Sequence, residues 1–462
     1  MARRPRTLVI LSYGLGWDST AILVRWLLDP SSRDFDLRDL IVVTAMTGDE
    51  FKSMGVLVEK YILPLMRAHG VRFVQVARGG ASTRAGVTIL DDSRSPTKVY
   101  LDGVYKLSDE MLESATVPQF GGARLCSQKQ KGVPLDFIID KLTKGKPFRH
   151  VMGFNADELN RVARDASYST VTRKSEYPLV TWGWGRAKLS EYVRESLGVE
   201  WEKSCCTFCP FAGSCKAEKM EALTSRYTAE PEAAVLALTI ERRSLAMNVR
   251  QPLFAKTSLF DVLAQTDPAL VALFEKDWNS AKAWSLYRVR RSFRGVGQAV
   301  RSLECIATGP KARMLARQAS FGEVEHTAGS PRVFVQRKVE DVFPVNEDMY
   351  VVAPAGVAPK TNAMFDAYWV RTGEVEAARA TGADEPCPKA RAMSFVLRYV
   401  VTHAANTFTK GDVQRAAGAS GVFTKEAGAA YDELKAEGRF GKVGKRMTLA
   451  PAAWGSVEAS PA

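Results

Sequence analysis

The sequence is poor in histidine and has no long apolar run. Its four histidines, His69, His150, His326 and His403, do not cluster along the chain, so we expect each to be structural. No Ser-His-Asp arrangement or zinc-hydrolase spacing is present. No stretch reaches the roughly 18–20 consecutive apolar residues that a transmembrane helix needs. The basic N-terminal segment leads into an apolar run too short for a secretory signal, so we expect a cytoplasmic protein without membrane contact.

Acidic residues are also under-represented relative to basic ones. The chain has 64 Lys and Arg against 51 Asp and Glu, which gives a formal net charge of +13 and a pI near 9.3. A basic excess favours polyanionic partners, because each phosphate contact releases counterions. A contribution to solubility alone explains the charge equally well, so both interpretations remain open.

Strand and helix patterns alternate in the N-terminal part. Apolar runs at 7–12, 40–45 and 71–77 predict strands, and 18–28 and 51–69 predict the helices between them. Further strands are expected at 150–154 and 177–182, and helices at 127–142 and 188–198, with 79–124 as a long loop. This alternation predicts an α/β fold, a parallel sheet wrapped by helices, whose ligands bind at the carboxyl ends of the strands.

The rest of the chain is less regular. Residues 217–300 look mostly helical and end in the basic and aromatic run 284–294, which is a nucleic-acid face or a solvated helix face. Residues 320–385 contain strand-like pieces, and 352–392 contains part of a linker. Residues 391–450 show three helices and a basic hairpin, the pattern of a winged helix that contacts DNA or docks a protein. We therefore expect domains at 1–216, 217–385 and 386–462.

The segment LSYGLGWDST, residues 11–20, joins the first predicted strand to the first helix. Glycines at such a turn let backbone N–H groups approach an anion at the positive end of the helix dipole. No Gly-Lys-Ser/Thr step follows, and the pattern is not G-x-G-x-x-G. A glycine pair followed by Asp-Ser resembles the pyrophosphatase loop of the ATP pyrophosphatase superfamily. The candidate nucleotide-binding residues are Ser12, Gly14, Gly16, Asp18, Ser19 and Thr20, with Asp18 and Ser19 also catalytic.

Two further segments resemble one branch of that superfamily. Thr47-Gly48-Asp49-Glu50 follows the second strand, and Asp49 is the candidate catalytic ligand of Mg²⁺, with Thr47 on the nucleotide. The segment from Gly153 to Glu158, with Arg161 and Arg164 downstream, supplies a nucleotide-binding glycine and two donors for phosphate or sulfate. Tyr177-Pro178-Leu179 followed by Trp182 also fits this branch. Each of these segments can also be an ordinary turn or helix start without a ligand.

Four of the seven cysteines lie between residues 205 and 215. The spacing Cys206-x-x-Cys209 lets two thiolates hold one metal, and Cys209-Pro210 is typical of iron–sulfur ligands. Cys215 and the distant Cys126 complete a candidate set of four. A [4Fe–4S] cluster, a structural zinc, and metal-free cysteines all fit this pattern, and Cys205 is an alternative to Cys206. Cys305 and Cys387 stand alone.

Together these motifs cover residues 7–215 and resemble the phosphoadenosine phosphosulfate reductase family, within the adenine nucleotide alpha-hydrolase-like superfamily. The C-terminal Glu-Cys-Gly-Leu-His tail of the plain reductases is absent from this sequence. The resemblance is therefore closest to the sulfur-activating iron–sulfur enzymes of DNA phosphorothioation. It implies that ATP and Mg²⁺ adenylylate an oxygen of nucleic acid, DNA rather than RNA, with release of pyrophosphate. Sulfur from a cysteine desulfurase or another donor then displaces AMP.

Two other functions remain open. A sulfonucleotide reductase-like enzyme acting on a small molecule would need no DNA. A nucleotide- and DNA-binding defence or sensor protein would bind both ligands without turnover.

Overall fold

A computed structural model of the chain divides into two compact units, residues 1–282 and 283–462, and each is described by itself. The described residues are 7–118, 124–213, 217–254, 257–295, 298–339, 342–358, 361–380, 392–393, 395–397, 399–400, 408–420, 422, 424–443 and 446–449.

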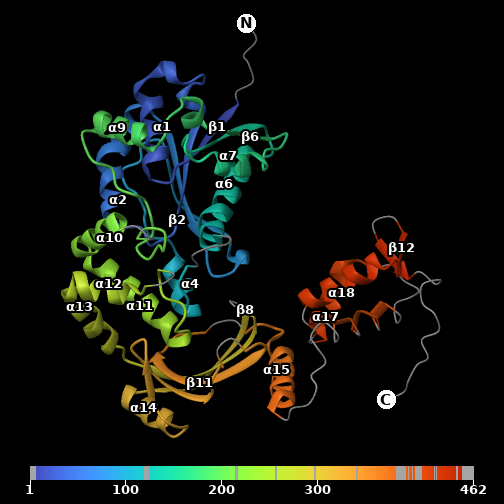
Figure 1. Cartoon of the computed structure of the whole chain (residues 1–462). Helices are drawn as coiled ribbons and strands as arrows, with labels where there is room; N and C mark the ends of the chain where they lie inside the picture. Colours follow the sequence, from blue (N-terminus) through green and yellow to red (C-terminus); the bar gives the residue numbers. More distant parts are fainter. Residues whose placement is uncertain are drawn as a thin grey trace. The chain divides into compact units, whose positions relative to one another are not determined.

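The first unit is built on a six-stranded sheet of order β4-β3-β2-β1-β5-β6 (Figure 1). Five strands run parallel, and only β4 pairs antiparallel, with β3. Their bounds are β1 Leu8–Ser12, β2 Leu40–Met46, β3 Arg72–Arg78, β4 Val87–Ser93, β5 Phe148–Met152 and β6 Arg173–Glu176. The predicted α/β class is confirmed in this form, a mixed and mostly parallel sheet flanked by helices.

Both faces of this sheet are buried at the central strands β1, β2 and β3, which explains why their sequences are mostly apolar. Along β1, Val9 and Leu11 belong to one hydrophobic core and Ile10 to another, because successive side chains point to opposite faces. Helices α1 (Trp17–Leu28), α3 (Leu63–Ala68) and α9 (Arg186–Leu197) contribute to the first core, and α6 (Val133–Thr143) to the second. The chain between β2 and β3 begins as α2 (Lys52–Leu57) and passes through a π-helical turn, η3 (Val58–Ile62), before α3.

Two predictions for this unit are wrong. Residues 79–124 are not one long loop, because the β-branched run at Val87 forms the edge strand β4 and α4 spans Leu107–Ser114. Residues 177–182 are not a strand. The strand there, β6, ends at Glu176, and Pro178 occupies the first position of the short helix α8 (Pro178–Thr181), where proline is favoured.

Other helices complete the first unit. Before α6 the chain forms α5 (Leu125–Ser127) and a second π-helical turn, η5 (Gln128–Gly132), and after β5 it forms α7 (Leu159–Ala166). The predicted helical region after residue 217 is present as α10 (Ala217–Ala229), α11 (Pro231–Met247), α12 (Leu259–Thr266) and α13 (Pro268–Asn279).

The second unit contains an antiparallel sheet of order β8-β7-β11-β10-β9. Its elements are β7 Trp284–Gly295, β8 Gln298–Gly309, α14 Lys311–Ala319, β9 Glu325–Thr327, β10 Ser330–Gln336, β11 Val345–Pro354 and α15 Phe365–Ala380. The basic run 284–294 is therefore not a helix face, since it forms the strand β7. Its arginines make internal contacts: Arg288 pairs with Asp348 at 2.6 Å, and Arg290 lies over the rings of Phe365 and Trp369.

The C-terminal segment shows helices α17 (Lys410–Ala419) and α18 (Thr424–Ala436) followed by the antiparallel hairpin of β12 (Phe440–Val443) and β13 (Arg446–Leu449). Thr409 caps α17, because its hydroxyl accepts the N–H of Asp412. The described parts of 392–400 are also helical. The winged-helix assignment stays a prediction. Among the described residues, no helix is both long and apolar enough to cross a membrane.

Candidate nucleotide site and cysteine segment

The order of the sheet places a ligand crevice at β1. The chain proceeds from β1 outward through β2 and β3 and then returns to the other side of β1 with β5 and β6. Ligands of open parallel sheets bind outside the carboxyl ends of the strands at such a reversal. Two of the predicted segments, residues 13–20 and 153–158, follow β1 and β5 at this edge.

The loop between β1 and α1 presents the start of a helix to this crevice. Gly16 is the N-cap residue, and among the described residues no side chain caps the helix. A methyl group added at Gly14 would meet no described atom within 4 Å. Leu15 adopts the left-handed conformation, φ 60°, while its side chain is buried. Ser19 Oγ accepts from Gly14 N at 3.1 Å, and Thr20 is buried with its hydroxyl on Tyr13. The uncapped positive end of α1 and the open space at Gly14 suit an anion.

Asp18 is held from two other segments. Its Oδ1 accepts from Asn155 Nδ2 at 2.7 Å, and its Oδ2 lies 3.1 Å from the Arg186 guanidinium. Arg186 begins α9 and also lies over the ring of Trp17, 5.1 Å from its centroid. Asn155 and Arg186 were not predicted. Arg186 carries no motif of its own, whereas Asn155 lies inside the recognised segment after β5.

The segment after β5 packs against the start of α1. A Cβ on Gly153 would lie 2.9 Å from Ser19 N, so glycine is required there by close packing of the two backbones. Asp157 Oδ2 accepts from Arg186 N at 2.7 Å and so caps α9. The two predicted anion-binding arginines lie on α7 and are exposed: Arg161 pairs with Glu158 and lies over Phe154, and Arg164 faces solvent.

The turn after β2 faces α4 and the cysteines. Gly48 has φ 87°, which favours glycine. Asp49 is 4% exposed, and its Oδ2 accepts a hydrogen bond from Ser108 N at 2.8 Å. Burial raises the pKa of Asp49 to about 6, although the hydrogen bond from Ser108 acts to lower it. Thr47 Oγ1 lies 3.2 Å from Cys206 Sγ. Asp49 therefore caps α4, while Thr47 contacts the cysteine segment, residues 201–209.

The cysteine segment lies directly on the β1–α1 loop. Trp201 donates its indole N–H to Leu15 O at 2.9 Å, and a Cβ on Gly16 would lie 3.6 Å from Ser204 Cβ. Cys206 forms an antiparallel bridge with Glu50. Trp201 is buried, although nothing in its spacing predicted a role. The two sites inferred separately from the sequence thus form one continuous region.

The thiols of this region share a buried, charged environment. Burial raises the pKa of Cys205 to about 12 and that of Cys206 well above its usual value. Burial also raises the pKa of Cys209, and a charge on Cys126 acts in the same direction. Arg124, two residues before Cys126, lies over the ring of Phe211.

A half-buried lysine completes this environment. Lys131 Nζ lies 3.1 Å from Glu50 Oε1. Burial favours the neutral amine, but Glu50, Cys206 and Cys209 outweigh it, so the pKa of Lys131 is raised.

The predicted fourth ligand, Cys215, lies outside the described residues, as does Cys387. Within the described residues, no three or more His, Cys, Asp or Glu side chains are grouped so as to hold a metal ion. The three described candidate ligands, Cys126, Cys206 and Cys209, thus do not form such a group.

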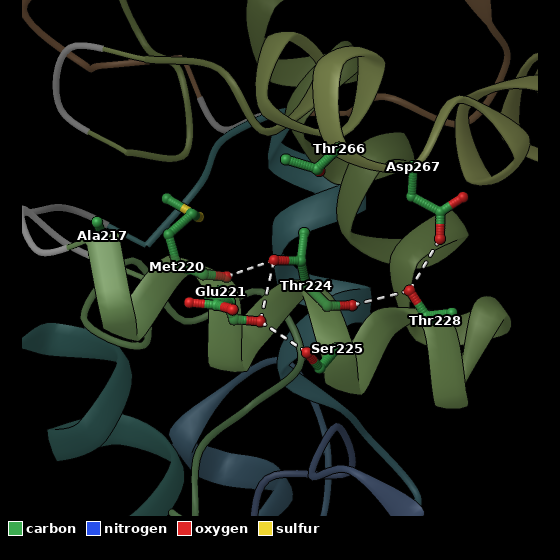
Figure 2. Close-up of a pocket in the computed structure, with 8 residues that line it drawn as sticks. All are labelled: Ala217, Met220, Glu221, Thr224, Ser225, Thr228, Thr266 and Asp267. Atoms are coloured by element: carbon green, nitrogen blue, oxygen red, sulfur yellow. Dashed lines mark hydrogen bonds between the residues drawn. The ribbon is translucent and has the colours of Figure 1, made fainter.

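A surface hollow of about 470 Å³ lies elsewhere in the first unit, on α10 and the end of α12 (Figure 2). Its hydroxyls are already paired: Thr224 donates to Met220 O at 2.6 Å and Thr228 to Asp267 at 2.8 Å. The hollow contains none of the predicted site residues, and its polar groups do not converge on a ligand.

No protein-family model matches the chain, and no curated protein matches it.

Proposed function

We propose that the first unit binds ATP at the β1–α1 loop and releases pyrophosphate while it adenylylates an oxygen of its substrate. The observation that carries this proposal is the convergence at one sheet edge of an uncapped helix start, open space at Gly14 and the anchored carboxylate of Asp18. The sequence motifs resemble the phosphoadenosine phosphosulfate reductase family at these same positions.

In this proposal the backbone N–H groups of the loop and the hydroxyls of Ser12 and Ser19 bind phosphate oxygens. Asn155 and Arg186 hold Asp18 at the helix start, and Gly153 lets the loop after β5 close on it. Arg161 and Arg164 supply further cationic donors from α7. Mg²⁺ accompanies the nucleotide, with Asp49 as its predicted ligand. Because Asp49 is buried on the N-terminus of α4, it also positions the Thr47 turn.

The cysteine segment adds sulfur chemistry to this proposal. Cys126, Cys206, Cys209 and Cys215 would hold a [4Fe–4S] cluster, or a structural zinc in its place, beside the nucleotide loop. When bound, an iron–sulfur cluster supplies redox or sulfur-transfer capacity that zinc lacks. The contact between Trp201 and Leu15 supports a coupled site, because it joins the cysteine segment to the loop that would hold ATP.

The proposed acceptor is nucleic acid, DNA rather than RNA. In the first step an acceptor oxygen attacks the α-phosphorus of ATP, and pyrophosphate leaves. In the second step a sulfide-level nucleophile from a separate donor protein attacks the activated atom of the acceptor. AMP leaves with the acceptor oxygen, and a carbon–sulfur or phosphorus–sulfur bond remains. The net charge of +13 and the three-helix and hairpin pattern of 386–462, which we assign to a winged helix, support a polyanionic partner.

Pyrophosphate release from ATP and Mg²⁺, with and without DNA, tests this function. We expect Asp18→Asn and Ser19→Ala to reduce pyrophosphate release at least 100-fold. The first variant removes the negative charge at the helix start, and the second removes the hydroxyl there. Asp277→Ala on the exposed side of α13 is the matched control and should leave release unchanged. Thermal unfolding establishes that the variants remain folded. Normal release by both loop variants, or none by the wild type with any nucleotide, would overturn the proposal.

A further inference from the structure

Ser12 makes a contact that its sequence motif does not explain. Ser12 ends β1, and its Oγ lies 2.8 Å from Nε2 of His150 on the neighbouring strand β5. On the next strand, β6, Arg173 donates from Nε to His150 Nδ1 at 2.7 Å. Three side chains from three parallel strands thus form one series of contacts, which runs from Arg173 at the start of β6 through His150 to Ser12 at the end of β1, where the β1–α1 loop begins.

The chemistry of arginine determines the proton positions in this row. A guanidinium only donates hydrogen bonds, so His150 Nδ1 must be the acceptor and the imidazole proton lies on Nε2. His150 Nε2–H therefore donates to Ser12 Oγ. Nε2 has no lone pair left to accept the Ser12 proton, which excludes His150 as a general base for Ser12 and excludes a serine-hydrolase dyad.

The surrounding charges keep this arrangement. Burial and then the Arg173 charge lower the pKa of His150 to about 4, while Asp165 acts in the opposite direction. Asp165 on α7 pairs with Arg173 at 3.0 Å and accepts from Tyr177 Oη at 2.9 Å, and Asp136 on α6 is close enough for Arg173 to influence its pKa. The imidazole is consequently neutral near pH 7, with a single tautomer.

The hydroxyl hydrogen of Ser12 has no acceptor among the described residues. Its Oγ already accepts from His150, and among the described residues no other side chain or backbone group bonds to it. Ser12 is half-buried where β1 meets the loop, so its hydroxyl can donate outward. A hydroxyl donates its strongest hydrogen bonds to anionic oxygens, at about 2.5–2.7 Å.

We propose that His150 and Arg173 are positioning residues of the nucleotide site, which commit Ser12 to donating its hydroxyl proton to a phosphate oxygen of the bound nucleotide. This inference rests on the proposed function, because it requires that the loop bind a nucleotide. Arg173 selects the tautomer of His150, His150 occupies an acceptor position of Ser12, and Ser12 alone touches the ligand.

The first experiment measures the affinity for a non-hydrolysable ATP analogue with Mg²⁺ by calorimetry, which requires no turnover. Ser12→Ala and His150→Met should each weaken binding about tenfold, and the double variant should be no weaker than either one. His150→Gln should come within about threefold of wild type, because its amide can accept from Arg173 and donate to Ser12. Additive losses, or wild-type affinity in Ser12→Ala, would refute the inference while leaving the loop as the binding site.

The pH dependence distinguishes positioning from simple support of the fold. In Arg173→Met the neutral imidazole can expose Nε2 as an acceptor, so Ser12 donates to His150 instead of the ligand. At low pH the imidazolium again donates to Ser12. Affinity should therefore be about tenfold weaker at pH 8 and should recover as the pH falls through the pKa of the ring, which burial keeps low, whereas wild type and Arg173→Lys should show no such recovery. A loss that does not change with pH would contradict the tautomer mechanism.

The second experiment needs no ligand. Nitrogen-15 spectra of the histidine side chains, with His150 assigned by its absence in His150→Gln, report its tautomer directly. We expect a neutral ring with the proton on Nε2 at pH 7, and the proton released to either nitrogen in Arg173→Met. A charged ring or an Nδ1–H tautomer in the wild type would overturn the inference. If the wild type binds no nucleotide, the proposed function fails and this role for Ser12 fails with it.

Discussion

Two glycines at the same sheet edge should respond in opposite ways to the addition of one methyl group. At Gly14 the new Cβ would meet no described atom within 4 Å, and its φ is not in the left-handed region. Replacing a glycine by alanine at such a position stabilises a protein by about 0.4–1 kcal/mol, because the unfolded chain loses freedom. Gly14→Ala should therefore unfold at or slightly above the wild-type temperature.

At Gly153 the same methyl group has no room. Its Cβ would lie 2.9 Å from Ser19 N and 3.2 Å from Ser19 Cα, which are backbone atoms of α1 that cannot rotate away. Overpacking of this kind costs about 1–3 kcal/mol. For a unit of this size each kcal/mol lowers the unfolding temperature by about 2–4 °C. Gly153→Ala should therefore be measurably less stable.

Gly14→Ala should also weaken nucleotide binding. In Gly14→Ala the methyl group occupies the space proposed for a phosphate oxygen, so we expect at least tenfold weaker nucleotide binding in a protein of normal stability. Calorimetric unfolding and binding of the same ATP analogue measure both quantities. Gly295→Ala in β7, where a Cβ also meets no described atom within 4 Å, is the control. Wild-type affinity in Gly14→Ala would refute the placement of phosphate over this glycine.

Three further predictions concern the surroundings of the loop. Trp201→Phe removes the hydrogen bond to Leu15, so the free energy of unfolding in urea should fall by about 1–2 kcal/mol and nucleotide binding should weaken. Unchanged binding would mean that the cysteine segment does not support the loop. Because the folded-state pKa of His150 is about 4 rather than 6.5, the folded chain binds fewer protons in that window, and stability should rise with pH from 4 to 6.5 by up to about 3 kcal/mol. This rise should flatten in His150→Gln, and an equal rise in both proteins would contradict the buried neutral ring. Cys206→Ser and Cys209→Ser should lose bound iron or zinc after anaerobic purification, whereas Cys305→Ser, exposed on β8, should retain it; equal metal content in all three would remove these cysteines as ligands.

Local patterns predicted most of the first sheet. The runs at β1, β2 and β3 are mostly apolar because both faces are buried there, and such runs are recognisable without tertiary information. The Thr409 cap is also a local feature, since an N-cap acts within four residues. The strand predicted at 177–182 was wrong because its apolar residues resemble a buried strand, and only Pro178 pointed to a helix start.

The strand β7 shows what the sequence pattern could not predict. Its arginines suggested an exposed surface, yet Arg288 is paired with Asp348, 60 residues away, and Arg290 lies over aromatic rings of α15. Charge along the chain does not report such partners, because they come from strands and helices that meet only when the sheet forms.

The sequence by itself determined the α/β class of the first unit and the glycine loop, the Thr-Gly-acid turn and the cysteine cluster, because each depends on residues close together in the chain. Only the tertiary structure decided that these segments adjoin, that Asn155 and Arg186 hold Asp18, and that His150 and Arg173 hold Ser12. The physical reason is distance along the chain: Ser12 and His150 are 138 residues apart, and Trp201 and Leu15 are 186 apart. No local pattern carries such pairs, and they exist only once parallel strands from distant parts of the chain lie side by side.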